Sequence, residues 1–230
     1  METGMKNENA KLAAITILGI CIFVSIMFVA FPFIQPELDP MKRFGSEYVV
    51  GRHGWLMRVA FYSFATGIAA FVFAIGKTFD SAIRSRLVMG LFSVGAVGIV
   101  FSGVFDTELL IPNSTPPPEW TESTILPWTH HAHKAAGITA FLSMVPAIGL
   151  MTRRLRKAGR LSGYFVILRV LAWLLPIAFV VFAAWSIEAG YAGFGQRLFL
   201  SLYFCWMLIA SYGILTGAFA RDANCSEPLA

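Results

Sequence analysis

LAAITILGICIFVSIMFVAFPF, residues 12–33, runs without a single charged side chain. A helix of about 20 apolar residues crosses the hydrocarbon core of a bilayer, which is about 30 Å thick. Further blocks of similar length and hydrophobicity follow along the chain. The sequence therefore predicts an all-α, polytopic membrane helix bundle with about six transmembrane helices, at residues 12–33, 55–75, 87–105, 135–151, 166–186 and 198–219.

The composition of the whole chain agrees with a membrane protein. Of the 230 residues, 57% are hydrophobic and 13% are charged, whereas soluble domains are about 25% charged. This length fits a single integral membrane domain over residues 1–230. The net charge of +5 does not indicate a nucleic-acid partner, because the basic residues stand between apolar blocks instead of lining one face. Cysteine spacing shows neither a disulfide framework nor a metal site.

Lysine and arginine are unevenly distributed over the segments between the blocks. Loops rich in these residues stay in the cytoplasm, and the densest cluster lies at residues 153–160. We therefore expect both termini to be cytoplasmic and the two long loops, residues 34–54 and 106–134, to lie outside. The cytoplasmic side then holds Lys6, Lys11, Lys77, Arg84, Arg86, Arg153, Arg154, Arg156, Lys157, Arg160 and Arg221, and the outer side holds Lys42, Arg43, Arg52, Arg58, Lys134 and Arg197.

Histidines and carboxylates mark a polar site at the predicted outer face. His130 and His133 lie three residues apart, so they share one face if the fourth helix begins in the loop, and His131 then points elsewhere. Two imidazoles at this spacing can hold zinc or another divalent metal, while the alternative is a hydrogen bond to a loop carbonyl. The candidate metal ligands are His130, His133 and His53, and the candidate catalytic residues are His133, Asp106 and Glu108.

The first outer loop carries residues suited to a lipid headgroup. The guanidinium groups of Arg52 and Arg58 match phosphate oxygens, and Trp55 suits the boundary between lipid and water. Alternatively, Arg58 pairs with Asp106 or Glu108. We favour this ion pair for Arg58, because charges at membrane depth are normally neutralised by a partner.

Proline and glycine predict local features of the helices. Pro146 and Pro176 fall in the middle of their blocks and are expected to kink the helices and to open a cavity between them. The third block is rich in glycine and serine, which favours close packing against neighbouring helices. The centres of the blocks carry no Asp, Glu, Lys, Arg or His, which argues against an ion-coupled transporter.

Three runs resemble DUF998, a family of bacterial polytopic membrane proteins without an established function. They are SEYVVGRHGWLM at residues 46–57, SGVFDTE at residues 102–108 and HKAAG at residues 133–137. The resemblance implies a multi-pass protein of the bacterial plasma (inner) membrane with a polar outer site. Members tend to carry His-x-x-x-His at the start of the fourth helix. Here Thr129 occupies the first position and His133 the second, so a metal-binding pair would require His130.

Two functions fit these observations. The first is a non-catalytic accessory, scaffold or lipid-binding subunit, with membrane lipids and a larger membrane complex as its partners. The second is a metal-dependent membrane hydrolase that acts on a lipid or small molecule at the outer face. We favour the first, because an active site is expected to show a sharper arrangement of residues than this chain does.

Overall fold

The computed structural model describes residues 2–81, 83–107, 128–161 and 163–219, and no strand occurs among them. The long helices are α1 (Glu2–Val24), α3 (Gly54–Thr78), α4 (Arg86–Val104), α5 (Trp128–Lys157), α6 (Ile167–Val180) and α7 (Ala192–Leu215). The shorter ones are η1 (Ser25–Ala30), α2 (Phe31–Ile34), η2 (Gly45–Val49), η3 (Gly163–Val166) and η4 (Val181–Ser186). The π-helical turns η1 and η4 extend α1 and α6 without a break.

Six helical segments are long and apolar enough to cross a membrane, which confirms the predicted number. They are Glu8–Ile34, Gly54–Thr78, Arg86–Val104, Trp128–Lys157, Ile167–Ser186 and Ala192–Leu215. The hydrophobic runs thus form helices because lipid offers no hydrogen-bond partner to the backbone, and a helix satisfies its own N–H and C=O groups. The chain is a multi-pass integral membrane protein.

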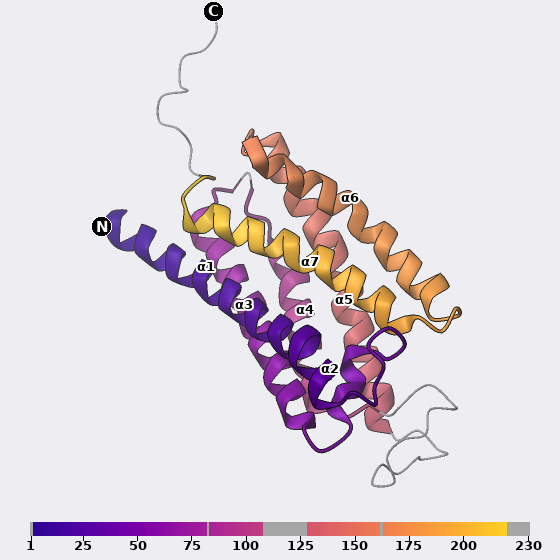
Figure 1. Ribbon diagram of the computed structural model, residues 1–230. Coiled ribbons are helices and arrows are strands. Elements are labelled where there is room, and N and C mark those ends of the chain that lie inside the picture. The colour runs from indigo at the N-terminus through magenta and orange to yellow at the C-terminus, as the bar shows by residue number, and fades with distance from the viewer. Residues whose placement is uncertain (1, 82, 108–127, 162, 220–230) are drawn as a thin grey trace, which may run out of the picture.

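The six helices close into a ring. Along the chain, α3 packs on α4, α4 on α5, α5 on α6 and α6 on α7, and α1 closes the ring between α7 and α3 (Figure 1). One end of the bundle carries the start of α1, the connections 79–85 and 158–166 and the end of α7; we call it the terminal end. The other end carries residues 35–53, 105–107 and 187–191; we call it the loop end.

Aromatic side chains fill the interior between α1, α3 and α7. The ring of Phe64 lies 5.1 Å from the rings of both Phe23 and Phe204, centroid to centroid. Nearer the terminal end, the buried Trp206 donates a hydrogen bond of 2.9 Å from its indole N–H to the hydroxyl of Thr152 in α5. Aromatic rings are large and bury much apolar surface when they pack together. Their size therefore helps to set the distances between the helices.

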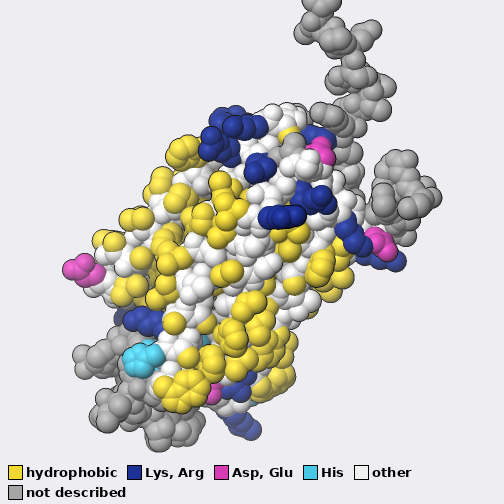
Figure 2. Space-filling view, turned by 180° about the vertical axis from the view of Figure 1, so that it is seen from behind, with side chains coloured by type: hydrophobic (Ala, Val, Ile, Leu, Met, Phe, Trp, Pro, Cys, Tyr) yellow, Lys and Arg dark blue, Asp and Glu magenta, His cyan; other side chains and the backbone are white. Residues whose placement is uncertain are grey.

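The outer surface is apolar where a soluble protein would be polar. Large hydrophobic side chains stay exposed, among them Phe33 at 82% and Trp173 at 76%. In the view of Figure 2 hydrophobic side chains cover the middle of the molecule, and Lys and Arg gather towards its two ends, mostly the terminal end. Hydrocarbon is the natural solvent for such a belt.

The fourth helix is longer than predicted at both ends. The sequence predicts it over residues 135–151, but α5 runs from Trp128 to Lys157. The prediction places the basic residues after 151 in a loop, yet Lys and Arg are good helix formers and are favoured near a helix C-terminus. The helix stops at Gly159, whose φ of +68° suits glycine, and Arg160 N–H bonds back to the Leu155 carbonyl.

The last helix is shifted relative to the prediction. The sequence predicts it over residues 198–219, but it begins at Ala192 and ends at Leu215. Gly193 and Gly195 suggest a loop by composition, but in the structure they lie in the helix and allow close packing. A Cβ on Gly193 would lie 2.4 Å from the Pro40 carbonyl oxygen, and one on Gly195 would meet the Ser186 side chain. Past the helix, Phe219 turns back onto the ring of Phe165, 4.8 Å away.

Candidate functional site

Residues 35–53, which we call the cap segment, fold against the first turns of α7 at the loop end. Arg197 holds them there: its guanidinium donates to the carbonyl oxygens of Pro40 and Arg43 and to the hydroxyl of Tyr48. Burial raises the pKa of the Tyr48 hydroxyl, and the charge of Arg197 partly opposes that rise. The ring of Tyr48 also stacks on Phe31 at 4.7 Å. The segment predicted as the first outer loop is therefore a packed structure.

Two further polar contacts secure the cap segment. The side-chain carbonyl of Gln196 accepts a hydrogen bond of 2.7 Å from the Gly45 backbone N–H, which joins the segment to α7. Within the segment, the buried side chains of Arg43 and Glu47, four residues apart, form an ion pair at 3.7 Å. Each charge thereby has the partner that a buried charge needs.

The two histidines of the predicted site lie on one face of α5, as expected. His130 is 2% exposed and His133 is 7% exposed, whereas His131 between them is exposed to the surroundings. The Nδ1 atom of His133 lies 3.0 Å from the Phe105 carbonyl oxygen, and that of His130 lies 3.2 Å from the Thr107 hydroxyl. Both rings therefore bond to the segment that follows α4. For His133 the partner is a carbonyl, the alternative to metal binding that the sequence left open, whereas for His130 it is a hydroxyl.

A cavity of about 230 Å³ opens beside these histidines. It lies between α5, the end of α6, the start of α7 and the cap segment. The polar residues that line it are Ser46, Thr107, His130, His133, Lys134 and Gln196. The apolar ones are Phe44, Gly137, Ile138, Phe141, Phe179, Phe182, Ala183 and Ile187. Along α5 the polar residues His130, His133 and Lys134 come first and the apolar Ile138 and Phe141 follow deeper in the helix, so the lining on this helix changes from polar to apolar.

The arginine and tryptophan candidates of the first outer loop have separate positions. Arg58 and Asp106 form an ion pair between α3 and the end of α4, which confirms the favoured partner. This pair is largely exposed, at 41% and 56% for the two side chains. Arg52 and Trp55 are exposed around the start of α3. None of these four residues is among the described residues that line the cavity.

The predicted metal ligands do not form a complete set in the described part of the chain. Over residues 2–81, 83–107, 128–161 and 163–219, no three His, Cys, Asp or Glu side chains lie close enough together to hold a metal ion. His53 caps the start of α3 and does not line the cavity. Glu108 lies outside the described residues. A two-histidine site at His130 and His133 stays a prediction.

Other lining residues are not anticipated from the sequence. Gln196 and Lys134 belong to helix segments that the sequence predicts as loop, and the phenylalanines of α5, α6 and η4 suit general lipid contacts equally well. A signal is present for Gln196, because it is a polar residue directly before an apolar block. Nothing local indicates that it meets residue 45, which is 151 positions earlier.

Comparison with known proteins gives a family. No curated protein and no solved structure matches the chain. The family model described as "Protein of unknown function (DUF998)" matches residues 17–213. That range includes all of the cap segment and the histidine-bearing start of α5, which agrees with the resemblance carried by the three short runs. The chain belongs to the DUF998 family.

Proposed function

We propose that this protein binds an amphiphile in the loop-end cavity, with the polar head beside His130, His133 and Lys134 and the hydrocarbon part among the phenylalanines. The observation that supports this most is the change along α5 from the polar lining residues His130, His133 and Lys134 to the apolar Ile138 and Phe141. A ligand that contacts both sets of residues must itself be polar at one end and apolar at the other.

The polar part favours a head with hydrogen-bond acceptors. Lys134 brings a cation, and Ser46 and Gln196 bring a hydroxyl and an amide. Hydrogen bonds between a charged donor and an acceptor are stronger than neutral ones. A phosphate, carboxylate or carbonyl-bearing head suits these groups best.

The apolar part favours a hydrocarbon segment. Phe141, Phe179 and Phe182 surround Phe199, at centroid distances of 5.1, 5.4 and 6.4 Å, and make a wall of aromatic rings. The volume of about 230 Å³ is below the ~300–1,000 Å³ of sites that enclose a whole drug-sized ligand. The cavity therefore takes part of a lipid, and the rest of the ligand extends into the bilayer.

Metal-dependent hydrolysis ranks second. A catalytic zinc site usually needs three protein ligands and a bound water. In the described part of the chain Asp106 is engaged by Arg58, and no carboxylate lines the cavity. An accessory role in a larger complex has no observation of its own, because the exposed apolar faces are equally expected from contact with lipid.

The proposed setting is the plasma (inner) membrane of a bacterium, with the termini in the cytoplasm and the cavity at the outer face. Lys and Arg are more numerous at the terminal end than at the loop end: the described residues include Lys11, Lys77, Arg84, Arg86, Arg153, Arg154, Arg156, Lys157 and Arg160 at the first, and Lys42, Arg43, Arg52, Arg58, Lys134 and Arg197 at the second. This supports the proposed orientation, because the positive-inside rule counts Lys and Arg and places the richer side in the cytoplasm.

The variant Gly137→Phe tests the proposal. Gly137 lines the cavity, and a Cβ there would meet no atom closer than 3.7 Å, so the new ring can occupy the cavity without disturbing the helix. Native mass spectrometry of the protein extracted with its own lipids should show a bound amphiphile. The variant should bind this amphiphile about tenfold more weakly or worse, which corresponds to a loss of about 1.4 kcal/mol of binding free energy.

The control is Gly90→Phe, because a Cβ on Gly90 of α4 has no atom within 4 Å and Gly90 does not line the cavity. It should retain the ligand. Lys134→Gln should weaken retention of an amphiphile with an acidic head while leaving the thermal unfolding temperature unchanged. Equal retention by the protein, Gly137→Phe and Lys134→Gln would contradict the proposal.

A further inference from the structure

A second hollow lies at the opposite end of the bundle, between α5 and α6. It is a groove of about 270 Å³. Pro176 and Gly149 line it, whereas Pro146 is not among its described lining residues. A hollow therefore lies between the two proline-containing helices, as expected, but not between the two prolines themselves. Three arginines also line it: Arg153 and Arg156 of α5, and Arg169 of α6. The groove shares no described lining residue with the loop-end cavity.

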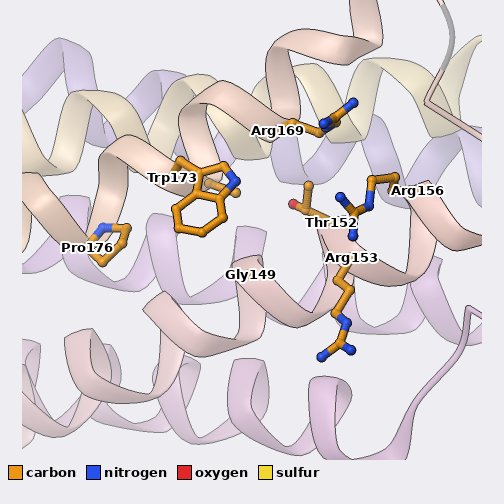
Figure 3. Close-up of a pocket in the computed structure, with 8 residues that line it drawn as sticks. Gly149, Thr152, Arg153, Arg156, Arg169, Trp173 and Pro176 are labelled. Carbon is orange, nitrogen blue, oxygen red and sulfur yellow. The ribbon is translucent and has the colours of Figure 1, made fainter.

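The guanidinium groups at this groove have no acidic partner among the described residues. Neither Arg156 nor Arg169 forms an ion pair with any described carboxylate. The acidic side chains described at the terminal end are engaged elsewhere, Glu8 by Lys77 and Asp80 by Arg160. In Figure 3, Arg169 on α6 and Arg156 on α5 both lie towards the same end of the groove, away from Pro176. Two like charges in such a place are stabilised by a shared anion.

The groove changes from basic to apolar along its length. Arg169 stands in the first turn of α6, and Trp173 and Pro176 follow one and two turns further into the span. On the facing helix, Arg156 belongs to the last turn of α5, and Gly149 lies about 10 Å deeper at 1.5 Å per residue. Figure 3 shows this order, with Trp173 and Pro176 beyond the arginines. A soluble anion would use only the basic part.

We propose that this groove binds an anionic phospholipid from the leaflet at the terminal end, with its phosphate between Arg156 and Arg169 and an acyl chain along Trp173, Pro176 and Gly149. The site is independent of the loop-end cavity, in position and in the chemistry of its polar part. It selects lipids by headgroup charge, since guanidinium groups bind phosphate oxygens in pairs of hydrogen bonds.

The experiment compares phosphatidylglycerol with phosphatidylcholine of the same acyl chains, each added to the detergent-purified full chain and measured by native mass spectrometry. The protein should bind phosphatidylglycerol more tightly. Arg156→Gln and Arg169→Gln should each weaken that binding about fivefold. The matched control is Lys157→Gln, which removes an exposed charge from the same helix end but outside the groove. An equal loss in Lys157→Gln would overturn the proposal, because it would mean that charge alone attracts the lipid.

A second pair of variants tests the shape of the groove. A Cβ on Gly149 has no atom within 4 Å, so Gly149→Phe fills the groove without a clash, and Gly90→Phe is again the control. Gly149→Phe should abolish the preference for phosphatidylglycerol, and Gly90→Phe and Gly137→Phe should retain it. Retention by Gly149→Phe would overturn the proposal. So would displacement of the lipid by an equal concentration of glycerol phosphate, which carries the head without the chains.

Discussion

Arg197 shows how a cation is accommodated within the first turns of a membrane helix. Its guanidinium donates to backbone carbonyl groups and to the phenolic hydroxyl of Tyr48. The Cζ atom of the guanidinium lies 5.7 Å from the centre of the Tyr48 ring. Each acceptor gains a charged donor where water is scarce. The residue thus serves the fold of the cap segment, whereas the exposed pair of Arg58 and Asp106 contributes little to stability, since exposed ion pairs are screened by solvent.

Replacing Arg197 by Met should destabilise the protein. The change leaves the Pro40 and Arg43 carbonyl groups without their donor, and a buried acceptor without a partner costs about 1–3 kcal/mol. Thermal unfolding in detergent should show a clear decrease in the unfolding temperature. The control Arg52→Met removes an exposed arginine of the same segment and should leave that temperature nearly unchanged. Equal temperatures for the two variants would contradict this role of Arg197.

For individual residues, the sequence predicts partners that follow from local spacing or from simple charge matching. The shared face of His130 and His133 follows from three-residue spacing, and the partner of Arg58 follows from the need to neutralise a charge at membrane depth. The role of Arg197 was not predictable, because its partner Pro40 lies 157 positions earlier and offers a backbone carbonyl. Any residue type carries that carbonyl, so the sequence holds no signal for it.

Close contact between helices depends on particular glycines. On α1, a Cβ at Gly19 would lie 2.3 Å from the Ser63 carbonyl oxygen of α3, and on α4 a Cβ at Gly98 would lie 2.7 Å from the Ala136 carbonyl oxygen of α5. Backbone atoms cannot move aside as side chains can. The predicted close packing of the third span is thereby confirmed, and the interface of α4 with α5 also sets the position of His133.

The variant Gly98→Val should destabilise the interface between α4 and α5. Overpacking of a tight contact typically costs about 1–3 kcal/mol of stability. Here the added side chain would meet the Ala136 backbone carbonyl, which cannot move aside as a side chain can. Gly90→Val in the same helix is the matched control, because a Cβ there meets open space. Unfolding temperatures in detergent measure both. If Gly98→Val were as stable as Gly90→Val, the two helices could not approach each other as closely as described above.

Helix positions were predictable from hydrophobicity, but several helix ends were not. The first turns of α5 and α7 contain histidine, lysine, glycine, glutamine and arginine, which resemble a loop in composition. They are helical because the cap segment and the residues after α4 supply partners for their polar side chains. Because Lys134 and Gln196 lie in these turns, the missed boundaries hid their place in the cavity lining, whereas the spacing of His130 and His133 already marked them as candidates.

The two ends of the molecule have different characters. At the loop end Arg43 and Arg197 have partners and a packed cap segment covers the bundle, and at the terminal end Arg156 and Arg169 form no ion pair with a described carboxylate. Figure 2 shows the apolar surface between them. This asymmetry suits a protein with a fixed orientation, an amphiphile site in one leaflet and an anionic phospholipid site in the other.

Single-cysteine labelling tests that orientation. The three native cysteines are replaced by serine, and one cysteine is introduced as Lys42→Cys or as Lys157→Cys. Because Lys42 belongs to the exposed cap segment and Lys157 to the basic terminal end, an impermeant maleimide added to intact cells should label the first and not the second. Permeabilised cells should label both. The reverse pattern in intact cells would contradict the orientation.

The most direct measurement of the central claim is an experimental density map of the protein extracted together with its native lipids. We expect elongated density in the loop-end cavity, with its head beside Lys134 and its tail against Phe179 and Phe182. A compact peak between His130 and His133 with the spacing of metal ligands, or a cavity filled by water alone, would contradict amphiphile binding. The first of these results would favour the metal-dependent hydrolase instead.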